Sequence, residues 1–244
     1  MASLLVLGAT GSFGRHVVEQ ALQSNREVSV LARNPSKLPP EVRERVTVHQ
    51  ADLAEAAIPW LTDLFRNQTA VINTAGSVRA GQSFVDLVDR VIAGLEDIPG
   101  QARPVSWFMA GAALLDLDDR GRRGVDLPAV SSTYWPHRVN FERLSHTSLD
   151  WRMLCPGPMA NEPPLGVARL RVSTDRLPVE IPSIVTSLPA SLALPYFVER
   201  VPEMVVSYAD AAALMLANLT PGGAMARRRV GLALPVGLRA KTEP

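Results

Sequence analysis

The sequence has little of several features, and each scarcity excludes a class of protein. It contains one cysteine, Cys155, so no disulfide can form within the chain, and a reducing cytosol is the expected environment. Neither sign of charge is in excess, because 25 Lys and Arg face 24 Asp and Glu for a net charge of +1. This balance argues against the overall basic field that proteins use to bind nucleic acid or an anionic membrane.

Long apolar runs and metal-ligand patterns are also missing. The run at 4–7 is too short for a signal sequence or a membrane span, and the apolar stretch 181–198 is interrupted by prolines. The four histidines have no metal-ligand spacing with Cys155 or with a paired carboxylate. We therefore expect a soluble cytosolic protein with no metal site, no nucleic-acid partner and no membrane partner.

Short apolar runs alternate with helical patterns along the chain. Strands are expected at 4–7, 27–32, 46–50, 70–75, 105–111, 150–157 and 227–234, and helices after residue 11 and at 84–95 and 207–219. This alternation predicts one α/β domain over 1–244, a Rossmann-like doubly wound parallel sheet covered on both faces. The proline-rich stretch 161–203 is less periodic, and we expect it to form a small irregular lobe that covers a substrate.

The strongest motif is "GATGSFG", which follows the first strand and opens a helix. Gly8 permits a tight turn, Gly11 lets the backbone approach a pyrophosphate, and Gly14 lets the helix pack closely on the strand. Phosphates would lie on backbone N–H groups at the start of the helix. The motif predicts a dinucleotide site whose remaining turn residues are Thr10, Ser12 and Phe13.

The end of the second strand, "VLARNPSK", indicates which dinucleotide is bound. An NAD site carries an acidic residue there for the ribose 2′-hydroxyl, whereas this chain has Arg33, with Lys37 just beyond. Guanidinium and ammonium groups are good partners for a 2′-phosphate, and Arg15 could add another cation. The predicted cofactor is therefore NADP(H), although Arg33 and Lys37 also fit a solvated loop.

These motifs, with "ADL" at 51–53, "INTAG" at 72–76, "LDWRMLCPGPMAN" at 149–161 and "VSYADAAALMLANL" at 206–219, resemble the atypical short-chain dehydrogenase/reductases. The chain is most similar to the NAD(P)H-binding branch with flavin and biliverdin reductases and NmrA-like regulators. The resemblance implies that Asp52 and Leu53 approach the adenine. It also implies that the adenosine and pyrophosphate side of the cofactor is lined by Asn73, Thr74, Ala75 and Gly76. The nicotinamide side would be lined by Pro156, Gly157 and Pro158.

The stretch "TYWPHRVNFE" lies where that family carries a tyrosine, a lysine four residues later and a glutamate four residues after that. Tyr134, Arg138 and Glu142 keep this spacing, but arginine replaces lysine, and "FMAG" at 108–111 lacks the family's serine. Arginine can lower a tyrosine pKa and contact a ribose, but its fixed charge cannot join a proton relay.

Two neighbours complicate the assignment of a proton donor. Pro136 is expected to begin the helix, which would leave Tyr134 outside it. His137, whose side chain ordinarily titrates near neutrality, is a rival donor. The candidates for catalysis are thus Tyr134, His137 and Arg138. Besides Tyr134 and His137, water is the third possible proton source, because a flavin-like acceptor needs no side-chain acid.

We expect an NADPH-dependent oxidoreductase that reduces a small apolar or aromatic carbonyl, quinone or flavin-like compound. The alternative is a catalytically silent NADP(H)-sensing protein of NmrA-like type, favoured by the missing serine and the lysine-to-arginine change. The substrate's identity and the oligomeric state stay open at this stage.

Overall fold

The structure, a computed structural model, describes residues 3–182, 185 and 188–240. Its strands are β1 (Ser3–Leu7), β2 (Glu27–Ala32), β3 (Thr47–Gln50), β4 (Ala70–Asn73), β5 (Val105–Met109), β6 (Trp151–Cys155), β7 (Met159–Ala160), β8 (Arg171–Thr174), β9 (Val206–Ser207) and β10 (Arg228–Ala233). Its helices are α1 (Ser12–Gln23), α2 (Pro40–Arg43), α3 (Ile58–Arg66), α4 (Gln82–Glu96), α5 (Pro128–Ser145), α7 (Ala190–Arg200) and α8 (Tyr208–Ala217). Every strand and helix expected from the apolar patterns is present.

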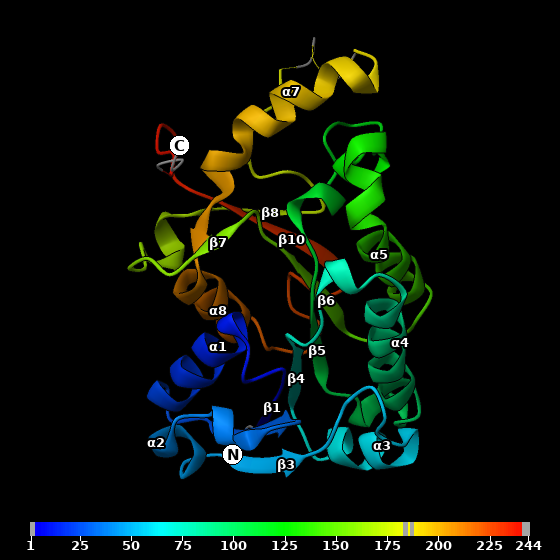
Figure 1. The fold of residues 1–244 in the computed structure, drawn as a ribbon, viewed down its shortest axis with the longest axis vertical. Helices are drawn as coiled ribbons and strands as arrows, with labels where there is room; N and C mark the ends of the chain where they lie inside the picture. The colour runs from blue at the N-terminus through cyan, green and yellow to red at the C-terminus, as the bar shows by residue number, and fades with distance from the viewer. Residues whose placement is uncertain (1–2, 183–184, 186–187, 241–244) are drawn as a thin grey trace.

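Eight strands form one sheet in the order β3-β2-β1-β4-β5-β6-β10-β8, which confirms the predicted Rossmann-like fold (Figure 1). Neighbouring strands are parallel from β3 to β10, and only β8 at the edge runs antiparallel. The chain direction across the sheet reverses beside β1, with β2 on one side and β4 on the other. Open α/β sheets bind ligands at such a switch point, outside the carboxyl ends of the strands.

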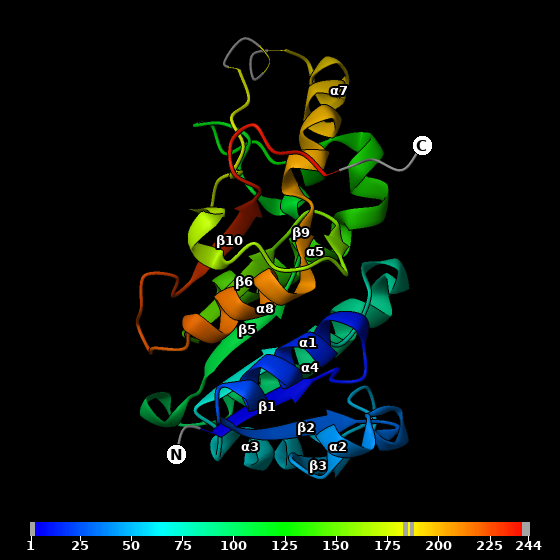
Figure 2. The same cartoon turned by 90° about the vertical axis from the view of Figure 1, so that its left-hand side faces the viewer.

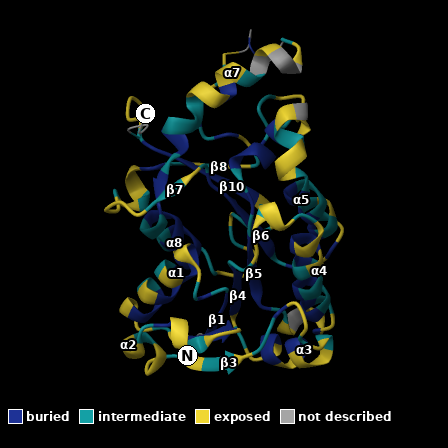
Figure 3. Ribbon diagram, viewed as in Figure 1, coloured by how far each residue is buried: buried dark blue, intermediate teal, exposed yellow. Residues whose placement is uncertain are grey.

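Helices cover both faces of the sheet, as Figures 1 and 2 show from two sides. Alternate residues of β1 point to opposite faces. Leu4 and Val6 pack with the buried residues of α1 and α8, whereas Leu5 and Leu7 pack with those of α3 and α4. The central strands are therefore buried on both sides (Figure 3), which explains their continuous apolar runs.

The segment 161–203 is more regular than the sequence indicates. Part of it forms β8, which pairs with β10 and so extends the main sheet. The helix α7 lies at one end of the molecule, beyond the sheet (Figures 1 and 2). A strand as short as β8 forms because the edge of the sheet at β10 is available for pairing. The local sequence does not show that this edge lies beside it. The role of this segment in covering a substrate stays a prediction.

The start of α5 differs from the expectation. The helix begins at Pro128, not at Pro136, and Pro136 lies in its interior. Proline suits the first turn of a helix, where its missing N–H costs nothing, and a second proline in the interior removes one hydrogen bond without ending this helix. Tyr134 and Arg138 are consequently both helical, and their spacing of four places them on one face.

Within the described residues, no helix has both the length and the apolar composition needed to cross a bilayer. The same part of the chain contains no cluster of three or more histidine, cysteine or acidic side chains suited to a metal ion. The cytosolic location stays a prediction.

Candidate functional site

The glycine turn after β1 has three glycines with different structural roles. Gly8 has a φ of +81°, and a Cβ there would lie 2.6 Å from the backbone nitrogen of Ala75. A Cβ at Gly14 would collide with the carbonyl oxygen of Gly8. At Gly11, by contrast, a Cβ would meet only the Gly8 oxygen, at 3.3 Å. Packing requires the first and last glycines, whereas the middle one faces open space.

That open space lies at the start of α1. Gly11 is the N-cap residue, and no side chain caps the helix with a hydrogen bond. The first backbone N–H groups of an uncapped helix are free donors and carry the positive end of the helix dipole. Ser12 is exposed, whereas the Phe13 ring is buried against Tyr208, with 6.3 Å between ring centroids. Only the backbone of Phe13 can therefore serve a phosphate.

The end of β4 forms the opposite wall of the turn. Thr74 donates from Oγ1 to the carbonyl of Leu7 at 2.7 Å, which ties the ends of β4 and β1 together. Asn73 is buried, and its Oδ1 accepts from the backbone N–H of Ala75 at 3.0 Å. Asn73 thus shapes the loop from beneath and does not line the space above it.

A cleft of about 610 Å³ opens at the carboxyl ends of β1 to β4, at the switch point of the sheet. Many of the residues predicted to bind cofactor line it: Gly8, Thr10, Gly11, Arg33, Lys37, Asp52, Leu53, Thr74, Ala75 and Gly76. The sequence assigned no site role to the other lining residues: Leu31, Ala32, Asn34, Ala51, Ala54, Ala80, Ser83, Phe84 and Leu87. Several of these flank the strand ends that the motifs had marked. Phe84 and Leu87 lie in the helix expected at 84–95, and only the tertiary packing makes the start of that helix a wall of the cleft.

The Pro-Gly turn after β6 does not line this cleft. The carbonyl of Pro156 accepts from the N–H of Ala112 at 2.8 Å, and a Cβ at Gly157 would lie 2.6 Å from the carbonyl oxygen of Met204. The turn is thus packed between the segment after β5 and the segment before β9. The predicted position of Pro156 and Gly157 beside a nicotinamide stays a prediction.

An aromatic cluster lies behind the cleft wall. The ring of His137 meets Phe84 edge-on, with 5.7 Å between centroids, and stacks on Tyr134 at 6.1 Å. A Cβ at Gly111 would lie 3.5 Å from Nε2 of His137, so this ring lies beside the segment that lacks the family's serine. Phe84 belongs to both groups, because it lines the cleft and also contacts His137.

The expected near-neutral pKa of His137 is wrong. Its side chain is 7% exposed, and burial lowers its pKa to about 4, because the charged imidazolium is poorly solvated there. Within the described residues Nδ1 has no hydrogen-bond partner. His137 is therefore neutral at pH 7.

Arg138 and Cys155 have simpler surroundings. The guanidinium of Arg138 pairs with Glu142 at 3.5 Å on the exposed side of α5, so its predicted contact with a ribose stays a prediction. Cys155 is fully buried, and burial raises the pKa of its thiol to about 12, so it is a core residue and not a nucleophile.

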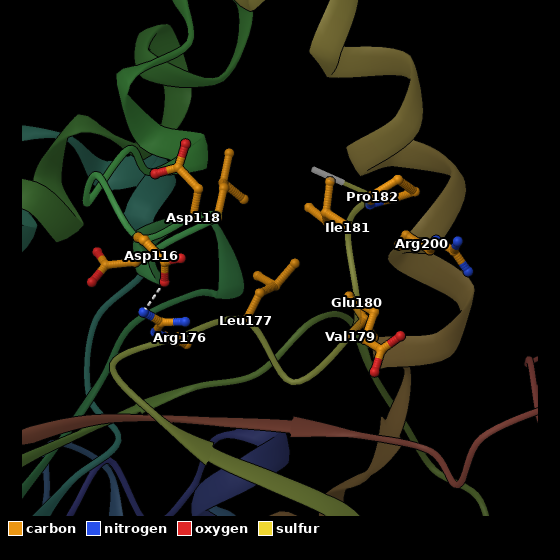
Figure 4. A pocket seen from close by; sticks show the side chains of 11 residues that line it. Asp116, Asp118, Arg176, Leu177, Val179, Glu180, Ile181, Pro182 and Arg200 are labelled. Atoms are coloured by element: carbon orange, nitrogen blue, oxygen red, sulfur yellow. Dashed lines mark hydrogen bonds and ion pairs between the residues drawn. The ribbon is translucent and has the colours of Figure 1, made fainter. Parts of the chain in front are cut away.

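A second cavity, of about 460 Å³, lies between residues 116–119, residues 176–182 and α7 (Figure 4). Leu177 and Ile181 point into it from two sides. Two of the acidic groups at its edge are paired, Asp116 with Arg229 at 3.0 Å and Asp118 with Arg122 at 2.6 Å. Apolar and charged side chains both line the cavity: Leu117, Leu177, Val179, Ile181 and Pro182 on the one hand, and Asp119, Arg176, Glu180 and Arg200 on the other.

Comparison with known proteins gives one family and a common fold. The family model described as NAD(P)H-binding matches residues 8–183. A candidate epimerase from Bacteroides thetaiotaomicron superposes with a TM-score of 0.73 at 18% identity, covering 98% of this chain and 99% of its own. A short-chain dehydrogenase/reductase from Veillonella parvula in complex with NADP gives 0.66 at 15% identity, covering 100% of this chain and 99% of its own. A candidate NADH-flavin reductase from Streptococcus pneumoniae gives 0.66 at 18% identity, covering 96% and 100%. No curated protein matches the chain significantly.

Proposed function

The chain belongs to the NAD(P)H-binding family, and from this premise we propose that it is an NADPH-dependent oxidoreductase. Its substrate is a small apolar or aromatic carbonyl, quinone or flavin-like compound. The observation that carries the proposal is the cleft at the switch point of the sheet, where the glycine turn, the uncapped start of α1 and two cationic side chains meet.

The residues present fit a phosphorylated dinucleotide. The space above Gly11 is one that a larger side chain would fill, and the free N–H groups of α1 border it. Arg33 and Lys37 line the same cleft from the end of β2 and would hold the 2′-phosphate. When bound, the nicotinamide supplies a hydride, and the chain's own residues bind, orient and shield it.

The proposed substrate class rests on the aromatic and apolar side chains beyond the cofactor cleft. Phe84, His137 and Tyr134 form an aromatic cluster of which Tyr134 is the exposed member, and His137 adds no charge to it at pH 7. The second cavity belongs partly to 161–203, the segment predicted to cover a substrate, and apolar side chains such as Leu177 and Ile181 form part of its walls. Such surroundings suit a flat or apolar molecule better than a charged one.

For the proton we favour Tyr134 over His137. An imidazole with a pKa of about 4 is almost never protonated at neutral pH and is a poor general acid there. Tyr134 is 38% exposed, stacks on His137 and shares a helix face with Arg138. In this assignment His137 positions the Tyr134 ring, and Arg138 supplies a positive charge one helical turn away.

The test is oxidation of NADPH by the purified protein with a panel of aromatic carbonyls, quinones and free flavins. Turnover with at least one class, and none with small charged acids, supports the proposal. A protein that binds NADPH in calorimetry but turns over none of the panel is a cofactor-sensing protein instead. A protein that binds no dinucleotide overturns the assignment as a whole.

A further inference from the structure

Two oppositely charged side chains meet at the rim of the cofactor cleft. The strands β2 and β3 are parallel neighbours, and their register pairs Ala32 with Gln50. Arg33 and Asp52 follow these strand ends almost at once, so they emerge side by side at the carboxyl edge of the sheet. Nη1 of Arg33 lies 3.6 Å from Oδ2 of Asp52, and both residues line the cleft.

The two partners are held very differently. Oδ1 of Asp52 accepts from the backbone N–H of Ala54 at 3.0 Å, and its carbonyl accepts from Ala56 N at 2.9 Å, so the carboxylate is fixed in a turn. The side chain of Arg33 is 77% exposed. Over the described part of the chain, its guanidinium has no other ion pair and no hydrogen bond. The guanidinium of Arg33 can therefore move away from Asp52, whereas the carboxylate of Asp52 is held in place.

We infer that Asp52 competes with a 2′-phosphate for Arg33 and thereby sets the preference between NADPH and NADH, an inference that rests on the proposed function. A 2′-phosphate has to draw the guanidinium away from Asp52 or share it. A ribose with a free 2′-hydroxyl leaves the pair intact. The carboxylate therefore weakens binding of NADPH but not of NADH. As a result, the preference for NADPH over NADH is smaller than Arg33 would give without Asp52.

The variant Asp52→Asn isolates this competition. Asparagine keeps an oxygen for the N–H of Ala54, so the turn is retained, while the negative charge is lost. The probes are 2′,5′-ADP and 5′-AMP, which carry the adenosine halves of NADPH and NADH without the nicotinamide. The ratio of their affinities, measured by calorimetry at low salt, cancels any contact that Asp52 makes with the adenine, because both probes share that base.

We expect Asp52→Asn to raise the preference for 2′,5′-ADP by roughly two- to fivefold, the size that an exposed ion pair supports. The same increase is expected in a Lys37→Met background, because Lys37 lines the cleft but makes no ion pair with Asp52 among the described residues. In an Arg33→Met background the increase should disappear, because the contested cation is gone.

Three results would overturn the inference while leaving the proposed function standing. Unchanged affinities for both nucleotides in Asp52→Asn would show that the pair does not oppose the phosphate. Equal changes in the two affinities, which leave their ratio constant, would make Asp52 a ligand of the shared adenosine. An increase that persists in Arg33→Met would show direct repulsion between carboxylate and phosphate. Absence of binding by the unaltered protein to either nucleotide would overturn the proposed function and this inference together.

Discussion

At the scale of a single residue, a substitution at Gly11 should affect cofactor binding without affecting folding. A Cβ at this position meets only one atom of the protein, but it occupies the space proposed for the pyrophosphate. We expect Gly11→Val to abolish NADPH binding in calorimetry while its circular dichroism spectrum stays unchanged. Gly14→Val is the matched control, since a side chain there collides with the backbone of Gly8 and should destabilise the fold itself. Normal NADPH binding by folded Gly11→Val would make the turn purely structural.

The burial of His137 predicts how stability depends on pH. Its pKa falls from 6.5 to about 4 on folding, so the unfolded state binds the proton more readily. This residue's stabilisation is complete above about pH 6.5 and is lost as the pH falls toward 4, by up to about 3 kcal/mol for such a shift. Chemical denaturation at pH 7, 6, 5 and 4 measures the loss.

His137→Phe should remove most of that pH dependence, since phenylalanine keeps the aromatic contacts but takes up no proton. His146, which is exposed at the C-terminal end of the same helix, provides the control, and His146→Gln should retain the dependence of the unaltered protein. Identical pH profiles for the two variants would contradict the assignment to His137.

Tyr134 carries the prediction about proton delivery. General acid catalysis contributes about 10²–10⁴-fold, so Tyr134→Phe should lower kcat by that order with little change in NADPH affinity. His137→Phe should reduce kcat less, because it removes a neutral neighbour and not the donor. Near-normal NADPH oxidation by both variants and by the double variant would mean that water supplies the proton.

At the scale of elements, one carboxylate ties an irregular segment to a helix. Asp210, in the first turn of α8, is buried and accepts from the backbone N–H groups of Leu165 at 2.9 Å and Gly166 at 2.8 Å. Ser207 both donates to this carboxylate and caps the helix. The segment at 161–170 is therefore positioned by α8 and not by strand pairing of its own.

We expect Asp210→Asn to cost about 1.5–3 kcal/mol, the range for a lost hydrogen bond to a charged group. The amide can accept from only one of the two N–H groups. Hydrogen exchange at Leu165 and Gly166 should accelerate, whereas Ser207→Ala, a loss of about 1 kcal/mol from capping, should leave both amides protected. Unchanged exchange at these amides in Asp210→Asn would show that other contacts hold the segment.

At the scale of the whole molecule, cofactor binding and folding are linked. A ligand present at a hundred times its Kd stabilises the folded state by about 2.7 kcal/mol, which corresponds to a rise in Tm of roughly 5–10 °C for a domain of this size. NADPH should give this rise, NADH at equal concentration a smaller one, and Gly11→Val none with either. Equal rises with both cofactors would argue against a role for Arg33 in selecting between them.

The sequence by itself determined the sheet, the glycine turn and the family resemblance. These features depend on local patterns: strand and helix periodicity is a property of neighbouring residues, and the conformational need for glycine at Gly8 is a property of one turn. The position of Arg33 and Lys37 at the cleft was predictable for the same reason. Both follow the end of β2, and the local sequence is enough to locate that strand end.

Tertiary structure decided what depends on residues far apart in the chain. Burial of His137 comes from packing against Phe84 and the segment after β5. The near-neutral pKa expected for an ordinary histidine side chain was therefore wrong. The extent of α5 was misjudged because a proline inside a helix looks locally like one that begins it. The pairing of Arg33 with Asp52 required the register of β2 on β3, because charge attraction acts between groups that only the folded sheet brings together.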